Sequence, residues 1–468
     1  IALIGQKVIS FAYFTYLARI FGPEDVGRYV FALSFTAIFS VLLDLGLSTV
    51  LTRELARDRS SAEHFVRLIM GYKVAASLVV ASIANIVIYL FGYPSLTREL
   101  VLLASIVMVL DSFTLSAYSA IRGFQTLVWE SIGSVLVQLV MATVGVVVSL
   151  YTRDLRFFMA AVVVAAACNA TYALWQLRFR FSVRLTPLYD ATGFKKLALL
   201  AWPFAAAAIL TRVYGYVDTI IISLLSGDRA VGIYSVAYKI TFALQFIPTA
   251  FSASLLPGFS AYFVTDRSKL ATTFVHGVSY LVAIATPISL GIVALAPEVV
   301  AHVYPGYHDS VLPLQVLMLS LPLLFASFPV GALLSACNRQ KRHTLNIGIA
   351  AAVTILLNLM LVPELGPLGA AIASFVSSCV LLGLGWVVMR QLISFDSGLL
   401  WRRFVGILVA GLAMYVFAMW GKLYLHYLLV AALAAMVYLV LIVLCGGITL
   451  GELRQLPRLF FKKSESAN

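Results

Sequence analysis

Apolar runs of about twenty residues recur from one end of the chain to the other, and they limit the possible folds more than any motif does. A helix needs about 20 apolar residues to cross a bilayer, and runs of this length, bounded by glycine, proline or charge, occur about fourteen times. Charged residues make up only 11% of the chain, against about 25% in soluble proteins. We therefore predict an all-α polytopic membrane protein with about fourteen transmembrane helices.

Lysines and arginines are distributed unevenly between alternate loops. Of the 33 in the chain, 22 fall in one set of loops and in the C-terminal tail, and 6 fall in the alternate loops. Cytoplasmic loops are enriched in Lys and Arg, so we predict a multi-pass protein of the cell membrane with the first set, and both termini, in the cytoplasm. The net charge of +13 then reflects topology, and we expect no nucleic-acid partner.

Several functional classes lack their signatures. The sequence contains no His-Glu-x-x-His, no Walker loop and no Gly-x-Ser-x-Gly, the patterns of metalloproteases, nucleotide hydrolases and serine hydrolases. The cysteines lie in apolar segments and are interpreted as small core residues. We therefore predict that the protein is not an enzyme and holds no metal or cofactor. The chain begins at Ile1 rather than at a methionine, so we expect a short N-terminal piece to precede it.

One internal repeat is visible. Residues 22–29 (the first repeat turn) and 227–234 (the second repeat turn) share Gly, Val, Gly and Tyr in register, at an offset of 205 residues. The same offset superposes Lys7 on Arg212. Six predicted spans separate the turns, an even number, so the two halves have the same orientation, as in parallel-repeat transporters.

The repeat divides the chain. We expect an N-terminal six-helix bundle, a cytoplasmic linker, a C-terminal six-helix bundle, two extra helices and a cytoplasmic tail. Their predicted boundaries are 1–178, 179–196, 197–390, 391–446 and 447–468.

Ionisable side chains inside the spans are the candidates for function, because each costs roughly 2.5–3.5 kcal/mol at the bilayer centre. A helix rises about 1.5 Å per residue, which places Asp218 at the depth of Lys239, and Asp44 at the depth of Lys7. We predict these two ion pairs, and structural docking of helices is the alternative to a functional role. Lys73 lies close enough to the inner surface to extend toward water.

Two further charges, Arg212 and Asp111, have no evident partner in the sequence. Arg212 and Asp218 share a helix but are about 120° apart around its axis, so they do not serve one another. A functional role is favoured for Arg212 and Asp111.

Several segments resemble the polysaccharide and O-antigen flippases, whose superfamily also contains multidrug and toxic-compound extruders and lipid II flippases. The resemblance covers essentially the whole chain. It is carried by residues 19–29, Trp202-Pro203-Phe204, residues 216–221, residues 231–238 and residues 366–371.

This resemblance implies two six-helix bundles that form a V around a central cavity, with alternating access. The implied cargo is an oligosaccharide on a polyprenyl pyrophosphate, moved from the inner to the outer leaflet. Lys7, Arg212 and Lys239 would then bind the pyrophosphate in the cavity. Membrane lipids and a polysaccharide polymerase are the other implied partners. The candidates for coupling or ion pairing are Asp44, Asp111 and Asp218.

Two alternatives remain open. A cation-coupled exporter of small amphiphilic drugs belongs to the same superfamily, but it would favour twelve spans and an acidic cavity. A membrane-embedded glycosyltransferase or acyltransferase would need acids and histidines grouped in its loops, and the short loops here contain no such group.

Overall fold

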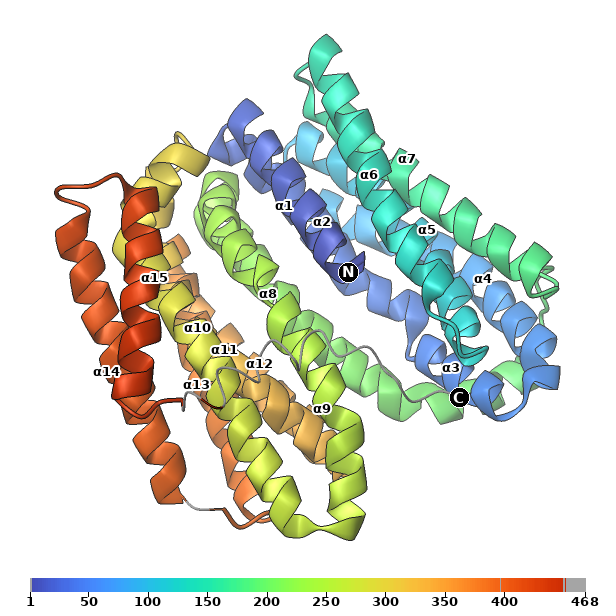
Figure 1. Cartoon of the computed structure of the whole chain (residues 1–468). Coiled ribbons are helices and arrows are strands. Elements are labelled where there is room, and N and C mark those ends of the chain that lie inside the picture. The colour runs from blue at the N-terminus through green and yellow to red at the C-terminus, as the bar shows by residue number, and fades with distance from the viewer. Residues whose placement is uncertain (1, 396, 449–450, 452–468) are drawn as a thin grey trace. The chain divides into compact units, whose positions relative to one another are not determined.

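Helices are the regular secondary structure of the part of the chain that the structure describes (Figure 1). The computed structural model describes residues 2–395, 397–448 and 451, and these residues form no strand. The all-α prediction is confirmed. The helices are α1 (Ala2–Ile20), α2 (Pro23–Asp44), α3 (Leu47–Arg57), α4 (Ala62–Leu90), α5 (Ser95–Gly123), α6 (Val128–Tyr151), α7 (Leu155–Trp175), α8 (Ala191–Ala243), α9 (Phe246–Thr265), α10 (Arg267–Val303), α11 (Val311–Ala336), α12 (Gln340–Leu365), α13 (Pro367–Arg390), α14 (Ser397–Gly421) and α15 (Tyr427–Leu444), with short helical turns η1 (Arg59–Ser61), η2 (Gln176–Arg180) and η3 (His308–Ser310).

Most of these helices have the length and composition of membrane spans. In the described chain, 12 helical stretches are long and apolar enough to cross a membrane. One of them, residues 191–265, holds two of the expected spans, and α1 adds a helix of 19 residues. The predicted polytopic membrane protein is therefore confirmed, whereas most of the predicted tail, residues 452–468, lies outside the described residues.

The chain divides into two compact units. Unit 1 comprises Ile1–Lys239 and Ala351–Ala370, and unit 2 comprises Ile240–Ala350 and Ala371–Asn468. This division differs from the boundary expected at residues 179–196, because α8 belongs to unit 1 as far as Lys239. The two six-helix bundles remain a prediction.

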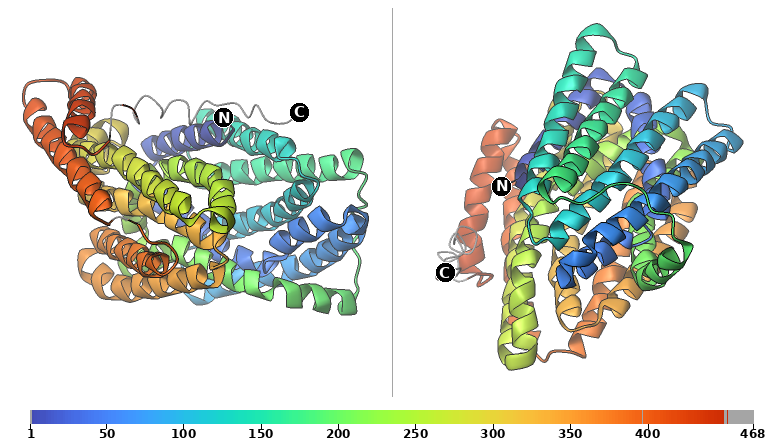
Figure 2. Two further views of the ribbon diagram at one scale, coloured as in Figure 1. Left: turned by 60° about the horizontal axis from the view of Figure 1, so that its bottom comes forward. Right: turned by 90° about the vertical axis from the view of Figure 1, so that its right-hand side faces the viewer.

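Helix α5 lies at the centre of unit 1, where it contacts α2, α3, α4 and α7. Its buried residues include Ala104, Ala117 and Ala120, and small side chains allow membrane helices to approach closely. Helices α6 and α7 lie side by side (Figure 2). Near their junction with α5, the Tyr118 hydroxyl donates to Asn169 Oδ1 at 2.6 Å, so this buried polar pair is satisfied.

The second expected span, residues 28–52, is too long. Helix α2 ends at Asp44, and Leu45 (φ 42°) and Gly46 (φ 75°) both adopt the left-handed conformation. A left-handed residue commonly terminates a helix. The chain then restarts as the separate helix α3 at Leu47.

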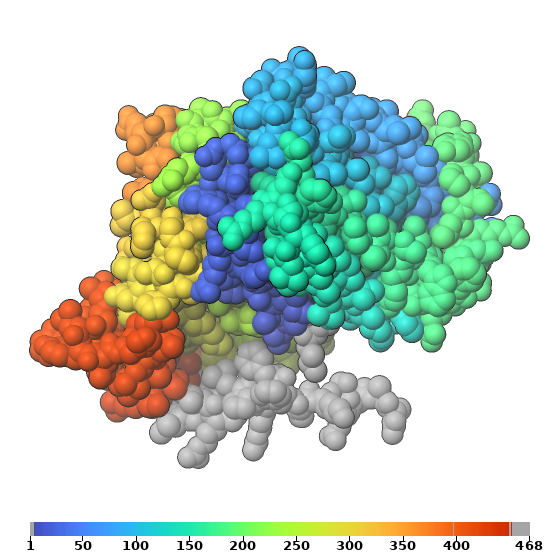
Figure 3. All heavy atoms as spheres, turned by 90° about the horizontal axis from the view of Figure 1, so that it is seen from above, coloured from blue at the N-terminus to red at the C-terminus, as the bar shows by residue number. Residues whose placement is uncertain are grey.

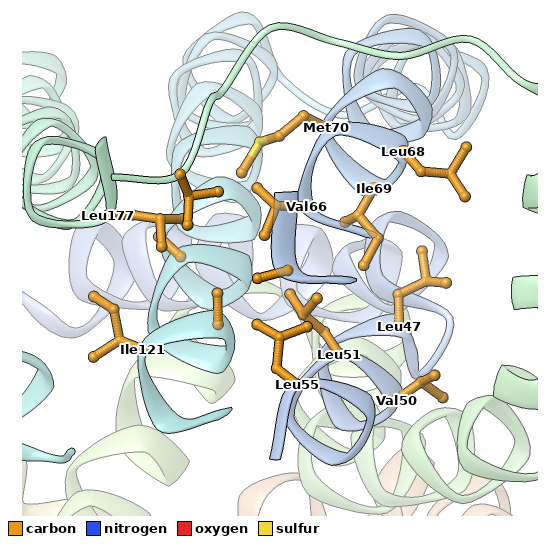
Figure 4. Close-up of a cluster of buried hydrophobic side chains, with 14 of the residues drawn as sticks. Leu47, Val50, Leu51, Leu55, Val66, Leu68, Ile69, Met70, Ile121 and Leu177 are labelled. Carbon is orange, nitrogen blue, oxygen red and sulfur yellow. The ribbon is translucent and has the colours of Figure 1, made fainter. Parts of the chain in front are cut away.

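Helix α3 is amphipathic, which explains why it does not continue the span. Leu47, Val50, Leu51 and Leu55 are buried in a core cluster with residues of α4 and α5 (Figure 4). Arg53 is among the polar residues on its other face, with 52% of its side chain exposed. One apolar stripe opposite charged residues is the pattern of a helix lying on a surface.

A non-helical segment, residues 181–190, lies where the linker was expected. It is held against α4 because the Leu188 backbone N–H donates to the Arg67 carbonyl at 2.9 Å. The rings of Tyr72 and Phe194 stack with centroids 4.7 Å apart, which fixes the first turn of α8 on the same helix.

Unit 2 is built around α10, which contacts α9, α11, α14 and α15. The Tyr438 hydroxyl of α15 donates to the Ala283 carbonyl of α10 at 2.7 Å, and Ser289 of α10 donates to the Met318 carbonyl of α11 at 2.6 Å. The space-filling view shows the α14–α15 pair (red) beside α10 (yellow) (Figure 3). The two helices beyond residue 391 are therefore packed parts of unit 2.

Candidate functional site

The two repeat turns touch one another through their backbones within unit 1. A Cβ added at Gly27 would lie 1.8 Å from the Asp228 carbonyl oxygen, and one added at Gly232 would lie 1.8 Å from that of Pro23. The 205-residue offset exchanges these two contacts, because it relates Pro23 to Asp228 and Gly27 to Gly232. Such reciprocity is the property of a twofold interface, and it supports the predicted repeat.

Arg28 links the two repeat turns electrostatically. Its Nε donates to Asp228 Oδ2 at 3.3 Å and its Nη1 to Asp25 Oδ1 at 3.0 Å, while Nη2 pairs with Glu24. Asp228 Oδ1 also accepts from Ser223 Oγ at 3.3 Å. Ion pairs of partly exposed groups contribute at most about 1 kcal/mol each, so the glycine contacts rather than the charges set how closely the turns approach.

Asp218 is buried, with 8% of its surface exposed. Its Oδ1 accepts from Asn358 Nδ2 of α12 at 2.7 Å, and its Oδ2 accepts from the Tyr234 hydroxyl at 2.9 Å. In the described chain Lys239 donates instead to Ser10 Oγ of α1 at 3.2 Å. The predicted pair of Asp218 with Lys239 is wrong, because equal depth does not fix the direction in which a side chain leaves its helix.

Lys7 and Lys239 bring two ammonium groups together from α1 and α8. The Lys7 charge acts directly on Lys239, whose Nζ also lies 5.2 Å from the centroid of the Phe14 ring. Both lysines are only partly buried. A neighbouring like charge disfavours the charged form of each lysine, and an anion near both would offset this repulsion.

Arg212 and Asp111 are also brought together, which their sequence positions did not indicate. The Arg212 guanidinium of α8 interacts electrostatically with the Asp111 carboxylate of α5, and it lies 5.8 Å from the centroid of the Tyr216 ring. Gly215, three residues on, shares this face of α8. A Cβ at Gly215 would meet nothing within 4 Å, so no neighbouring side chain packs closely against α8 at this position.

Asp44 pairs with Lys73 and not with Lys7. Lys73 Nζ lies 3.4 Å from Asp44 Oδ1 and donates to the Ser112 carbonyl at 2.6 Å, and Asp44 also accepts from Ser48. The predicted Lys7–Asp44 pair is therefore wrong. Lys73 does not extend to water either, since its side chain is fully buried (0% exposed). Asp44 and the Ser112 carbonyl take the place of its hydration.

Asn358, Tyr234 and Ser10 complete the site and were not predicted. A faint signal existed for Asn358, an amide deep within an apolar helix, since polar side chains in spans commonly bond across helices. Nothing distinguished Ser10 from the other hydroxyl groups of the spans, and Tyr234 was marked by the repeat but not as a partner of Asp218. The searched, described residues contain no group of three or more His, Cys, Asp or Glu side chains able to hold a metal ion.

The comparison with known families identifies the chain. A family model described as "Polysaccharide biosynthesis protein" matches residues 1–263, more than half of the sequence. The chain belongs to this polysaccharide biosynthesis family. The resemblance to polysaccharide flippases is thereby confirmed.

A curated relative of this polysaccharide biosynthesis family member is named as a flippase. It is the "Probable flippase AglR" of Haloferax volcanii, 32% identical over 169 residues, which cover 35% of the chain and 35% of that relative. The chain thus aligns with about a third of AglR.

Two solved structures match most of the chain. The lipid II flippase MurJ in an inward closed conformation has a TM-score of 0.80 at 13% identity. The match covers 95% of this chain and 97% of the MurJ chain. An inward-facing multidrug resistance MATE transporter of the MOP superfamily has a TM-score of 0.66 at 14% identity. That match covers 83% of this chain and 95% of the MATE chain. MurJ leaves 5% of the chain uncovered, which is less than the combined length of α14 and α15. The match with MurJ therefore extends into these two helices.

Proposed function

We propose that the protein is a flippase that moves a polyprenyl-pyrophosphate-linked oligosaccharide from the inner to the outer leaflet by alternating access. The observation that carries this proposal is that unit 1 contains two pairs of interacting ionisable groups on α1, α5 and α8, Lys7 with Lys239 and Arg212 with Asp111. Such groups are costly in an apolar interior. Intramembrane charges of transporters mark substrate pathways for this reason.

The sign of this charge selects the class of substrate. Within the two pairs, Lys7, Lys239 and Arg212 supply three cations and Asp111 supplies one anion. An anion with several oxygens, such as a pyrophosphate, would accept hydrogen bonds from two ammonium groups at once. A cationic drug would be repelled by the same groups, which is why we prefer the flippase to the multidrug exporter of the same superfamily.

Three aspartates remain candidates for coupling transport to an ion or a proton. The partners of each carboxylate decide which candidate we prefer. Asp44 is engaged by Lys73, which favours a structural role. Asp218 is held by Asn358 and Tyr234, and Asp111 faces the substrate cation Arg212. We therefore propose that Asp111 competes with the pyrophosphate for Arg212, so that substrate release restores the Arg212–Asp111 interaction.

The cellular setting follows from topology. The distribution of Lys and Arg supports cytoplasmic termini and a location in the cell membrane. The protein would then act as a transporter and not as an enzyme, receiving its substrate at the cytoplasmic face. It would deliver the substrate to a polysaccharide polymerase on the other side.

Replacing Arg212 by alanine tests the proposal. A hydrogen bond to a charged group contributes about 1.5–3 kcal/mol, so Arg212→Ala should lower transport of a lipid-linked oligosaccharide roughly tenfold or more. The measurement is the appearance of a labelled lipid-linked oligosaccharide in the outer leaflet of proteoliposomes. Arg153→Ala, at an exposed position before α7, is the control and should transport normally. Wild-type vesicles that leave the oligosaccharide in its original leaflet would refute the flippase, and unchanged transport by Arg212→Ala would remove Arg212 from the site.

A further inference from the structure

Unit 2 contains a cavity of about 590 Å³ that is separate from every group discussed above. Small-molecule sites commonly enclose about 300–1,000 Å³. Helices α10, α11, α13 and α14 all contribute to its walls. Most of the lining side chains are apolar, and the aromatic ones include Trp386, Trp401 and Phe404.

One end of this cavity is polar and cationic. Arg390 ends α13 and Ser397 begins α14, and both line the cavity. Arg390 Nη2 donates to Ser397 Oγ at 3.4 Å, and both residues are exposed. The N-terminal end of α14 adds positive partial charge. An anionic oxygen placed here would accept hydrogen bonds from the guanidinium and the hydroxyl.

The topology puts this polar end at the cytoplasmic surface. Residues 390–403 contain three arginines and one aspartate, Asp396, which lies outside the described residues. This loop belongs to the set that the positive-inside rule places in the cytoplasm. Trp386 and Trp401 are of the residue type enriched at membrane–water interfaces. The cytoplasmic leaflet carries the anionic lipids, and basic pockets between helices on that side bind their headgroups.

We propose that this cavity binds one anionic glycerophospholipid of the cytoplasmic leaflet, with an acyl chain in the apolar interior and the phosphate at Arg390 and Ser397. A zwitterionic lipid would fill the apolar part equally well, but its headgroup has no net charge to balance Arg390. The bound lipid is distinct from the transported substrate. The cavity lies within unit 2, whereas the cations proposed to bind the substrate belong to unit 1.

Tryptophan quenching tests this proposal, because Trp386 and Trp401 line the cavity. The full chain is reconstituted into phosphatidylcholine vesicles with rising fractions of phosphatidylglycerol or phosphatidylcholine brominated on the acyl chains. Phosphatidylglycerol should quench at the lower mole fraction. The other tryptophans, Trp129, Trp175, Trp202 and Trp420, are replaced by phenylalanine. The fluorescence then comes from Trp386 and Trp401 alone.

Arg390→Gln should lower the apparent affinity for phosphatidylglycerol about fivefold. This is the change in affinity that one arginine contributes near an anionic lipid surface. Arg339→Gln is the matched control, since Arg339 is an exposed arginine in another loop of unit 2 with the same predicted orientation. It should leave the affinity unchanged. Equal quenching by the two lipids, or equal effects of the two substitutions, would overturn the proposal.

Gly383 offers an independent test of the apolar part. It lines the cavity, and a Cβ there would meet nothing within 4 Å, so Gly383→Phe fills space without displacing backbone. This variant should lose the selective quenching while its thermal unfolding midpoint is maintained. Retained selectivity contradicts the proposal. Displacement of brominated phosphatidylglycerol by an equimolar polyprenyl phosphate would also overturn it, because the cavity would then belong to the carrier lipid.

Discussion

Position 27 leaves no room for a methyl group, because the Asp228 carbonyl occupies the place of its Cβ. Gly27→Ala must therefore push the two repeat turns apart, and overpacking of this kind costs about 1–3 kcal/mol. We expect a lower midpoint of thermal unfolding in detergent. Gly22→Ala is the matched control, since a Cβ at Gly22 meets nothing within 4 Å. Similar losses in both variants would show that the contact between the turns is unimportant for stability.

Lys73 presents the opposite situation, a charge whose removal leaves its partners behind. Lys73→Met deprives Asp44 of its cation and the Ser112 carbonyl of its donor. Removing one partner of a buried pair costs about 3–5 kcal/mol, and the 16% exposure of Asp44 favours the lower figure. The free energy of unfolding measures this loss, and the exposed Lys195→Met serves as the control.

A double variant checks that the loss comes from the ion pair. Adding Asp44→Asn to Lys73→Met removes the stranded charge, so the double variant should be more stable than the sum of the single losses predicts. Strictly additive losses would mean that the two side chains act independently.

The sequence identified the right residue types inside the spans but not their partners. Burial cost alone singled out Arg212, Asp111 and Asp218. Depth along a helix follows from counting residues, whereas the direction of a side chain depends on how helices are rotated and bent. That missing rotation is why Asp218 was matched to Lys239 and why Asn358 was overlooked.

Among the elements, α8 consists of two helices that meet at a kink at Gly227. Gly227 has φ 81° and ψ 178° within α8, a conformation essentially restricted to glycine that costs other residues about 1–3 kcal/mol. Gly227→Ala should lower stability through the backbone alone, because its Cβ would meet nothing within 4 Å. Gly215→Ala in the same helix should instead raise stability by about 0.5–1 kcal/mol, since alanine suits a helix interior. Thermal unfolding of the two variants should therefore shift in opposite directions.

The existence of the helices was predictable, and their ends were less so. Runs of apolar residues identify spans because each backbone group must be satisfied within its own segment. The apolar run through residues 28–52 concealed the end of α2, because Leu45 is not a residue type that signals a left-handed turn. Gly46 and the change from a continuous apolar run to a one-sided apolar pattern at α3 were the signals of the break.

At the scale of the molecule, the distribution of charge predicts which loops face which compartment. His308, before α11, lies in a predicted outer loop, and Arg339, after α11, lies in a predicted cytoplasmic loop. In a cysteine-free chain, His308→Cys should react with a membrane-impermeant maleimide in intact cells. Arg339→Cys should react only after permeabilisation. The reverse pattern would invert the topology and with it the proposed direction of transport.

The meeting of the repeat turns has an evolutionary consequence. Each turn presents the same surface to the other, so the contact has the form of a homodimer interface retained inside one polypeptide. A bulky residue at position 27 or 232 would collide with the backbone of the other turn. Each turn therefore restricts which substitutions the other can accept. The two copies of an ancestral duplication would therefore have diverged along their helices while remaining restrained where the turns meet.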